Sequence, residues 1–357
     1  MCIFCCTFAD GMNKELLYQK LGEWYEQNHR ILPWRETEDP YKIWISEIIL
    51  QQTRVAQGMD YYHRLVTRFP DIQSLAEAQE DEVLLYWQGL GYYSRARNLH
   101  KAAQLMQKHP LFNNHASELL ADDIFAALKS MPGVGDYTAG AIASFAFNLP
   151  YPALDGNVYR VLARLYDCEI AFDTTEGKKH FRKLAEELLD RRHPRLFNSA
   201  IMELGALHCV PTAPDCGNCP MNIWCKALAN NTVELLPVRK PRPKVRDRYL
   251  KYTIYIAPDN TTLIHQRKGN DIWKHLWEFP LNELRIKNFE LRDKTNKVLE
   301  LTHVLSHQKL HARFVIKNVP ELPKIPDTLV VKLSELDNYA FSRLTLKVIE
   351  KLSSIRT

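Results

Sequence analysis

The chain lacks any apolar run that approaches the roughly 20 residues needed to span a bilayer. Residues 1–11 lack the basic start and the long apolar segment of a secretory signal, so we expect a disordered lead-in and no secretion. Neither sign of charge dominates, because 47 Lys and Arg oppose 42 Asp and Glu for a formal net charge of +5. These absences exclude a membrane protein, and the mildly basic balance does not by itself identify a partner.

The chain also has no internal repeat or low-complexity tract, and its 357 residues exceed what one hydrophobic core usually fills. Apolar residues recur at helical spacing through residues 12–230, which predicts an all-α domain. Residues 231–248 combine proline with like charges and are predicted to form a stiff, basic linker. Period-two alternation followed by a final helical pattern predicts a small α+β domain over residues 249–357.

The cysteines are not spread along the chain as in a secreted disulfide scaffold. Four of the eight form the pattern Cys209-x6-Cys216-x2-Cys219-x5-Cys225. Four thiolates so close in sequence can surround one metal centre in a reducing compartment, and both Zn²⁺ and a [4Fe–4S] cluster accept four such soft ligands. The spacing leaves these two occupants open. Because protein fills every ligand position, the site is expected to be structural.

A Pro-Gly-Val-Gly segment at residues 132–135 predicts a tight turn between two helices. Its glycines, Gly133 and Gly135, would expose backbone N–H groups at the start of the second helix, which is a natural seat for a phosphate. A ligand-free connector is the alternative interpretation. The preceding proline and the following small-residue helix favour phosphate binding.

Two acidic residues lie in unusual sequence settings. Glu47 stands in an apolar helical pattern, where a buried acid needs a partner. Asp155 precedes Gly156, a position typical of a turn or an N-cap. Taken alone, neither acid predicts catalysis.

Together these features resemble the endonuclease III superfamily, in which a helix-hairpin-helix turn precedes a four-cysteine loop with this spacing. Four segments are similar to its MutY branch of adenine DNA glycosylases: Leu32-Pro33-Trp34-Arg35, Trp44 to Thr53, Gly89 to Arg97, and Leu154-Asp155-Gly156-Asn157-Val158. The resemblance implies a mainly α N-terminal catalytic region, with the helix-hairpin-helix and a [4Fe–4S] cluster loop, followed by a small α+β Nudix-like domain. It also implies base excision repair of adenine opposite 8-oxoguanine or guanine.

The resemblance assigns chemistry to particular residues. Glu47 corresponds to the general acid that protonates adenine, and its apolar neighbours would favour the protonated form. Asp155 corresponds to the acid that stabilises the cationic sugar, while Asn157 and Tyr137 would orient the pair. Superfamily members that also cut the strand place a lysine at the position of Tyr137, so we expect a monofunctional glycosylase.

The resemblance assigns DNA contacts as well, because the target base must be flipped out of the stack. The adenine pocket would include Trp34, Arg35, Leu50 and, as a further acid, Glu203. The side chains that wedge into the duplex would be Gln52 and Tyr92. The turn that holds the backbone would be Gly133, Val134 and Gly135. The contacts to the lesion would be Ser306 and His307.

Several positions depart from the family pattern. Leu305 stands where many relatives place Phe, His275 occupies a usual glycine, and the loop from Val210 to Asp215 lacks basic residues. No glutamate-rich Nudix box is visible, so recognition without nucleotide hydrolysis is expected. We expect a monomer in the bacterial cytosol or nucleoid that acts on double-stranded DNA. The alternatives are a thymine- or oxidised-pyrimidine-specific member of the superfamily and a non-catalytic DNA-binding protein.

Overall fold

The computed structural model describes residues 12–113, 118–241, 245–284 and 297–354. The expected lead-in at residues 1–11 lies outside the described residues, as do residues 242–244 of the predicted linker. The chain divides into two compact units, one of Met1–Gln52 with Leu105–Pro241 and the other of Thr53–Gln104 with Arg242–Thr357. In the described part of the chain no helix is long and apolar enough to cross a membrane.

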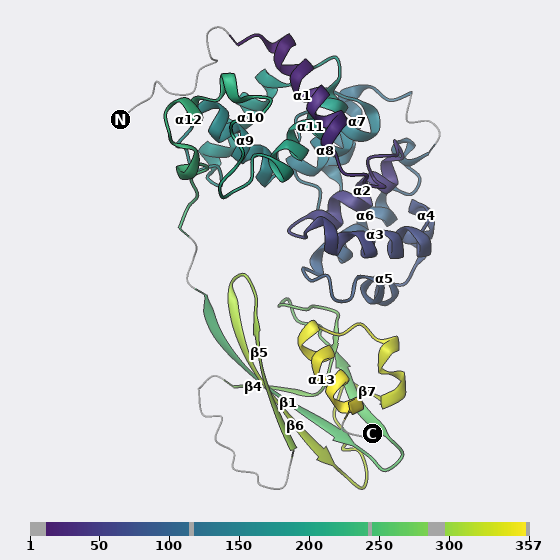
Figure 1. The fold of residues 1–357 in the computed structure, drawn as a ribbon. Helices are drawn as coiled ribbons and strands as arrows, with labels where there is room; N and C mark the ends of the chain where they lie inside the picture. Colours follow the sequence, from purple (N-terminus) through teal and green to yellow (C-terminus); the bar gives the residue numbers. More distant parts are fainter. Residues whose placement is uncertain (1–11, 114–117, 242–244, 285–296, 355–357) are drawn as a thin grey trace. The chain divides into compact units, whose positions relative to one another are not determined.

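The first unit is helical, as the sequence predicts (Figure 1). Its α-helices are α1 (Lys14–Asn28), α2 (Pro40–Leu50), α7 (Ala121–Ser130), α8 (Asp136–Phe147), α9 (Gly156–Tyr166), α10 (Thr175–Leu188), α11 (Pro194–Leu207) and α12 (Lys226–Ala229). Its 3₁₀ turns are η1 (Pro110–Phe112), η3 (Asn222–Trp224) and η4 (Val233–Leu235). Short polar residues cap several of these helices, for example Asn13 at α1 and Thr174 at α10.

Helix α8 is the centre of this unit, because its residues from Thr138 to Ala146 are all buried. Small side chains let other segments approach its backbone closely. A Cβ at Gly140 would lie 2.6 Å from the Pro152 carbonyl oxygen, so the contact requires a glycine. A second apolar core joins α1 to helices α9–α12 through residues such as Leu17, Leu162 and Phe181.

The second unit begins with the helices α3 (Val55–Arg68), α4 (Ile72–Glu77), α5 (Glu80–Trp87) and α6 (Ser94–Met106). The predicted β alternations are confirmed as strands, and the final pattern as helix α13 (Arg343–Ser354). The strands are β1 (Arg246–Ile256), β2 (Thr261–Gln266), β3 (Trp277–Glu278), β4 (Leu281–Leu284), β5 (Lys297–Val304), β6 (Gln308–Asn318) and β7 (Thr328–Lys332), followed by η5 (Leu333–Asn338).

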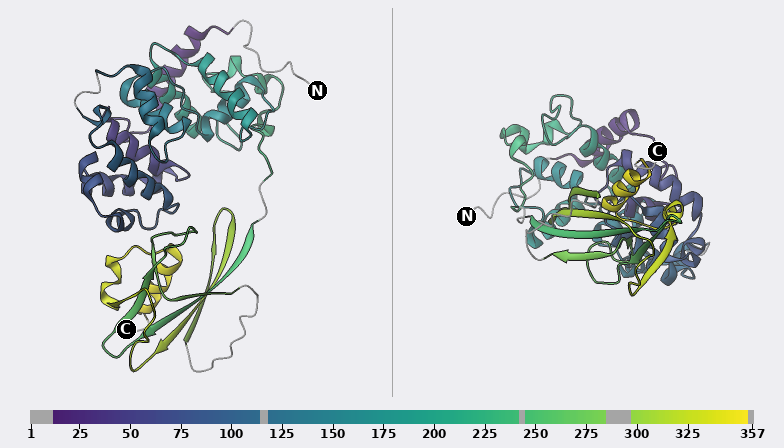
Figure 2. Two further views of the ribbon diagram at one scale, coloured as in Figure 1. Left: turned by 180° about the vertical axis from the view of Figure 1, so that it is seen from behind. Right: turned by 90° about the horizontal axis from the view of Figure 1, so that it is seen from below.

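Two sheets form in this unit (Figure 2). One has the order β4-β1-β6-β5, with β1 and β6 parallel and the outer pairs antiparallel. The other has the order β3-β2-β7 and is antiparallel. Strand residues such as Tyr252 and Phe314 pack with Leu344 and Val348 of α13 in one core, so the helix covers apolar strand positions.

Residues 238–240 of the predicted linker make ordered contacts within the first unit. The Phe172 N–H donates to the Val238 carbonyl at 3.3 Å, and the Lys240 N–H donates to Asp173 at 2.9 Å. The Arg239 guanidinium lies over the Phe172 ring. Residues 238–240 are therefore held against the segment that precedes α10.

Candidate active site and cysteine loop

Helix α2 presents Glu47 from an apolar surface. Asp39 caps the helix by accepting from the Tyr41 and Lys42 N–H groups, and Pro40 occupies the first turn, where its missing N–H costs nothing. The helix is buried from Ile43 to Ile49, and Glu47 itself is only 1% exposed. A carboxyl group so deeply buried requires hydrogen-bond partners.

Two side chains supply those partners. The Tyr137 hydroxyl, from the first turn of α8, donates to Glu47 Oε2 at 2.7 Å. The Arg35 guanidinium lies 3.5 Å from Oε1, and it also lies 3.6 Å from the centre of the Phe145 ring. Burial, with Glu47 and Asp155 nearby, raises the pKa of Tyr137 well above its ordinary value, so the hydroxyl keeps its proton at neutral pH.

Asp155 is the N-cap of α9. Its Oδ1 accepts from the Asn157 and Val158 N–H groups at 2.9 and 2.8 Å, and its Oδ2 accepts from the Asn157 side-chain amide at 2.9 Å. Burial raises the pKa of Asp155, while these N–H donors oppose the rise and the charge of Glu47 adds to it. The structure therefore brings Glu47, Tyr137 and Asp155 into one electrostatically coupled group.

Arg160, which was not predicted from the sequence, holds Asn157, the partner of Asp155, in place by a hydrogen bond. Its guanidinium donates to Asn157 Oδ1 at 2.9 Å and to the carbonyls of Gly205 and Cys209 at 2.6 and 2.7 Å. A Cβ at Gly205 would come within 2.7 Å of Asn157 Cβ, so Asn157 is also fixed by packing. The available signal was an arginine at a buried position of the apolar helix α9, where a charge needs several acceptors.

The predicted phosphate-binding turn joins α7 to α8. Gly133 adopts a φ of 81°, which an L side chain rarely adopts, and Gly135 is the N-cap of α8. The Val134 N–H donates to the Met131 carbonyl and its side chain is buried, whereas Gly133 and Gly135 are exposed. The exposed start of α8 is thus available to an anion.

A cavity of about 210 Å³ lies beside Arg35. Trp34 and Arg35, two of the predicted pocket residues, line it together with Tyr25, Thr37, Phe145, Arg195, Leu196 and Ser199. Leu50, a third predicted pocket residue, is half-buried at the end of α2 and is not among the lining residues. Ser199 was missed because a serine in a helical pattern carries no distinctive signal.

Glu203, the further predicted pocket acid, makes an ion pair in the structure. Arg30, also missed by the sequence analysis, donates to it from its backbone N–H at 3.0 Å and from its guanidinium at 2.6 and 2.7 Å. Burial alone would raise the pKa of Glu203, but these hydrogen bonds outweigh it and lower the pKa. Glu203 is not among the residues that line the cavity beside Arg35.

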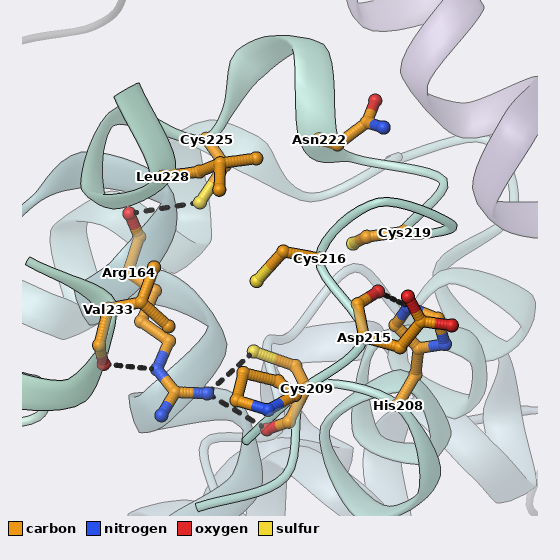
Figure 3. Close-up of a pocket in the computed structure, with 11 residues that line it drawn as sticks. Arg164, His208, Cys209, Asp215, Cys216, Cys219, Asn222, Cys225, Leu228 and Val233 are labelled. Atoms are coloured by element: carbon orange, nitrogen blue, oxygen red, sulfur yellow. Dashed lines mark hydrogen bonds between the residues drawn. The ribbon is translucent and has the colours of Figure 1, made fainter. Parts of the chain in front are cut away.

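The four cysteines of the predicted metal site line one small cavity of about 30 Å³ (Figure 3). Cys209 follows α11, and the other three lie in the loop that leads to α12. Burial raises the pKa of Cys219 to about 12, and a bound metal would offset this rise by favouring the thiolate. Within the described residues, no group of three or more His, Cys, Asp or Glu side chains is arranged around a single metal ion.

A second buried arginine of α9, Arg164, holds this loop. It donates to Cys209 Sγ at 3.3 Å and to the Val233 carbonyl at 3.0 Å (Figure 3). It also donates to the carbonyls of Val210 and Pro211 at 2.8 and 3.1 Å. Its own carbonyl accepts from the Cys225 thiol at 3.5 Å. The donor set of four thiols, backed by one guanidinium, suits a metal cluster that carries net negative charge.

The predicted wedge and lesion contacts lie at exposed turns. Gln52 and Tyr92 are exposed and have φ values of 58° and 46°, so both residues adopt the left-handed region. Ser306 and His307 form the turn between β5 and β6 and are exposed, with Ser306 Oγ 3.3 Å from His307 Nδ1. Tyr92, Ser306 and His307 line one cavity of about 390 Å³ in the second unit.

Comparison with known proteins identifies the class. Residues 45–191 match the HhH-GPD superfamily of base excision DNA repair proteins, and residues 251–351 match the NUDIX domain. A thermostable thymine-DNA glycosylase of known structure is similar, with a TM-score of 0.52, 25% identity, and coverage of 61% of this chain and 97% of its own. The fold and these matches define a DNA glycosylase of base excision repair with a Nudix-like C-terminal domain.

Sequence relatives narrow the class to a family. The adenine DNA glycosylase of Buchnera aphidicola subsp. Baizongia pistaciae is 32% identical over 358 residues, which cover 97% of this chain and 99% of the relative. The adenine DNA glycosylase of Homo sapiens is 40% identical over 228 residues, covering 62% of this chain and 41% of the human protein. The chain belongs to the adenine DNA glycosylase family, whose members remove adenine in base excision repair.

Proposed function

We propose that this enzyme is a monofunctional glycosylase that hydrolyses the N-glycosidic bond of adenine paired with 8-oxoguanine or guanine and leaves an abasic site. The observation that carries the proposal is the buried carboxyl group of Glu47, which faces the Tyr137 hydroxyl and is electrostatically coupled to Asp155. Two carboxyl groups can divide the work of the reaction between the departing base and the sugar.

Glu47 acts as the general acid. Adenine is a poor leaving group as an anion, so a proton must reach its ring as the bond to the sugar breaks. When Glu47 gives up this proton, a carboxylate forms in a buried site, and the Tyr137 hydroxyl and the Arg35 guanidinium can stabilise the new charge. The departing adenine would occupy the cavity beside Trp34 and Arg35.

Asp155 stabilises the sugar cation. Its three N–H donors favour the charged carboxylate and fix its direction, since Asn157 is itself held by Arg160 and Gly205. An anion held in this way needs no reorganisation when the cation develops. Tyr137 occupies the position of the strand-cutting lysine and carries no amine, so base release is expected without efficient strand scission.

The cysteine loop would hold a [4Fe–4S] cluster through Cys209, Cys216, Cys219 and Cys225. When bound, the cluster would stabilise the loop and take no part in bond cleavage. The chain contributes the four thiols, and Arg164 neutralises part of their charge. Analysis of purified protein should find about four iron and four sulfide per chain. A colourless protein that contains one equivalent of zinc would refute the cluster.

The DNA contacts follow from the exposed turns. The glycine turn at residues 133–135 would hold a phosphate, Gln52 and Tyr92 would enter the duplex, and Ser306 and His307 would contact the base opposite adenine. We propose that the protein acts on DNA as a monomer. We propose the bacterial cytosol or nucleoid as the location of this function.

The decisive experiment uses the full-length protein and duplexes that place adenine opposite 8-oxoguanine or guanine, with thymine opposite guanine as a comparison. We expect release of adenine, with strand breaks only after alkaline treatment. Glu47→Gln should abolish adenine release and spare DNA binding, because the proton matters in the transition state. Release of thymine but not adenine would overturn the substrate assignment. Strong strand scission without alkali would overturn the monofunctional mechanism.

A further inference from the structure

The turn between β2 and β3 adopts a conformation that favours glycine. Trp273 and His275 have φ values of 59° and 65°, in the left-handed region that L side chains rarely occupy. The His275 N–H donates to the Arg267 carbonyl at 2.7 Å, and its own carbonyl accepts from the Gln266 side chain at 3.0 Å. The backbone at His275 is therefore fixed in a conformation that a glycine would adopt at a lower conformational energy than a histidine.

The side chain at this position has a partner elsewhere in the same compact unit. His275 Nδ1 contacts the carboxylate of Glu80, the first residue of α5, as a hydrogen bond that becomes an ion pair when the ring is protonated. Next to it, the Gln266 side chain donates to Asp81 at 2.8 Å. The Arg97 guanidinium of α6 donates to the Lys274 carbonyl at 2.8 Å. Helices α5 and α6 thus hold the turn through three side-chain contacts.

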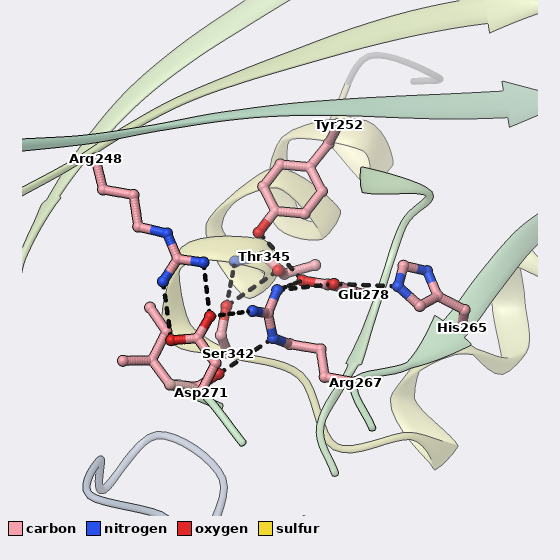
Figure 4. A network of polar contacts seen from close by, with 9 residues as sticks. Arg248, Tyr252, His265, Arg267, Asp271, Glu278, Ser342 and Thr345 are labelled. Carbon is pink, nitrogen blue, oxygen red and sulfur yellow. Dashed lines mark hydrogen bonds and ion pairs between the residues drawn. The ribbon is translucent and has the colours of Figure 1, made fainter. Parts of the chain in front are cut away.

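A second set of contacts joins the same parts of the chain at Phe341. The Phe341 N–H donates to the Gln88 side chain at 2.7 Å, and its carbonyl accepts from the Tyr93 hydroxyl at 3.2 Å. The turn is also tied to the core of the small domain, because Asp271 pairs with Arg248 and Arg267 (Figure 4). The turn is therefore held by side chains of α5 and α6 as well as by Arg248 and Arg267.

These contacts enclose the cavity of about 390 Å³ in this unit. One wall is formed by residues 89–94 and Arg97, and the other by residues 271–273, the β5–β6 turn and Arg343. Tyr92 lies on the first wall, and Ser306 and His307 lie on the second. His275 and Glu80 do not themselves line the cavity, but their contact joins the two parts of the chain that form its walls.

We propose that His275 and Glu80 form a latch that sets the spacing of these walls and so determines how strongly the enzyme prefers adenine opposite 8-oxoguanine over adenine opposite guanine. The inference rests on the proposed function, since it requires the cavity walls to read the base opposite adenine. His275 and Glu80 are positioning residues that do not touch the reacting atoms. A glycine at position 275 would adopt this backbone conformation more easily than His275 does, but it has no side chain that could reach the Glu80 carboxylate.

The test measures single-turnover adenine release from both mispairs for the wild-type protein, Glu80→Gln, His275→Asn and the double variant. Asparagine tolerates the left-handed conformation but is too short to reach as histidine does, so the backbone of the turn is preserved. Each single variant should lower the ratio of the two rates roughly five-fold, with the rate on adenine opposite guanine unchanged, and the double variant should lower it no further. Glu77→Gln, which removes a charge from an exposed acid of the neighbouring helix α4, is the matched control.

The outcomes distinguish failure of the proposed reading of 8-oxoguanine from failure of the latch between His275 and Glu80. A wild-type protein that shows no preference for 8-oxoguanine would refute lesion reading itself. A wild-type preference that Glu80→Gln and His275→Asn leave intact would refute the latch alone, as would effects that add fully in the double variant. Thermal unfolding of each variant shows whether a lost preference reflects lost folding. A fall in both rates with a lower unfolding temperature would also overturn the latch, because the pair would then serve stability only.

Discussion

The hydrogen bond between Tyr137 and Glu47 provides the sharpest test of the proposed chemistry. Tyr137→Phe removes only the hydroxyl that donates to Glu47 Oε2 at 2.7 Å and keeps the ring in place. In the proposed mechanism Glu47 gives its proton to adenine, so this hydroxyl contacts a developing carboxylate in the transition state. The bond should therefore be stronger in the transition state than in the ground state, which is the condition for an effect on the chemical step.

The expected magnitude follows from this difference. A hydrogen bond between neutral groups contributes about 1 kcal/mol and one to a charged group about 1.5–3 kcal/mol, so the transition state should lose roughly 0.5–2 kcal/mol more than the ground state. Since about 1.4 kcal/mol corresponds to a factor of ten, adenine release should slow roughly two- to thirtyfold. DNA affinity should stay unchanged, because the hydroxyl is directed at Glu47 and not at the duplex.

The assay is single-turnover release of adenine with enzyme in excess over a duplex that carries adenine opposite 8-oxoguanine. Tyr151→Phe is the matched control, because it also removes a hydroxyl that donates to a carboxylate, Asp122, at 3.1 Å, but at an exposed position. The control should react like the wild type. A wild-type rate for Tyr137→Phe, or a slower rate fully explained by weaker DNA binding, would show that the hydroxyl does not support a charge on Glu47.

Three further predictions concern stability. Burial raises the pKa of Asp155, so its carboxylate destabilises the folded protein above that pKa. Asp155→Asn, which can still cap α9, should therefore raise the unfolding temperature at neutral pH. Calorimetry should show that this gain vanishes below about pH 4, where the carboxyl group is protonated in both states. Arg30 lowers the pKa of Glu203 against the effect of burial, so this acid stabilises the fold above its unfolded pKa of about 4.3 and loses that effect as pH falls through the lower folded value. Glu203→Gln should accordingly cost about 1–2 kcal/mol in urea unfolding at neutral pH, and an equal cost under acid conditions would contradict the ion pair. Gly140→Ala should lower the free energy of unfolding by roughly 1–3 kcal/mol, because the added Cβ would meet the Pro152 carbonyl. Gly22→Ala in α1, whose Cβ would have nothing within 4 Å, should raise it by about 0.5–1 kcal/mol. Equal effects of the two variants would refute the close approach at Gly140.

Much of the fold could be predicted because the spacing of apolar residues indicates helices and strands, and proline and glycine indicate where they end. The helical pattern of residues 12–230 and the alternation around Ile254 and Phe314 each report burial of one face, and the structure forms helices and strands there. The division of residues 53–104 from the rest of the helical region could not be predicted in this way. It depends on contacts distant in sequence, such as that between Tyr93 and Phe341.

The site was predictable to the extent that its residues stand out from their surroundings. Glu47 is an acid in an apolar helix, and the four cysteines cluster in sequence. Two arginines were missed: Arg30, which pairs with Glu203, and Arg160, which holds Asn157. Arginine is common at the surface, and the partners of these two come from segments that are remote or carry no distinctive signal. Arg160 could have been found by asking which charges lie on a buried helical face.

Helix α9 connects the candidate catalytic residue Asp155 to the cysteine loop through Arg160 and Arg164. Asp155 begins the helix as its cap, Arg160 lies at a buried position between Asn157 and the Cys209 carbonyl, and Arg164 lies one turn further on against the Cys209 sulfur. The helix therefore carries, in order, Asp155, the acid proposed to stabilise the sugar cation, and the two arginines that contact the cysteine loop. Because a capped helix is rigid over such a length, a displaced cysteine loop would shift the Asp155 carboxylate as well. If Asp155 has its proposed role, the cysteine loop would affect catalysis through the position of this carboxylate and not by taking part in bond cleavage.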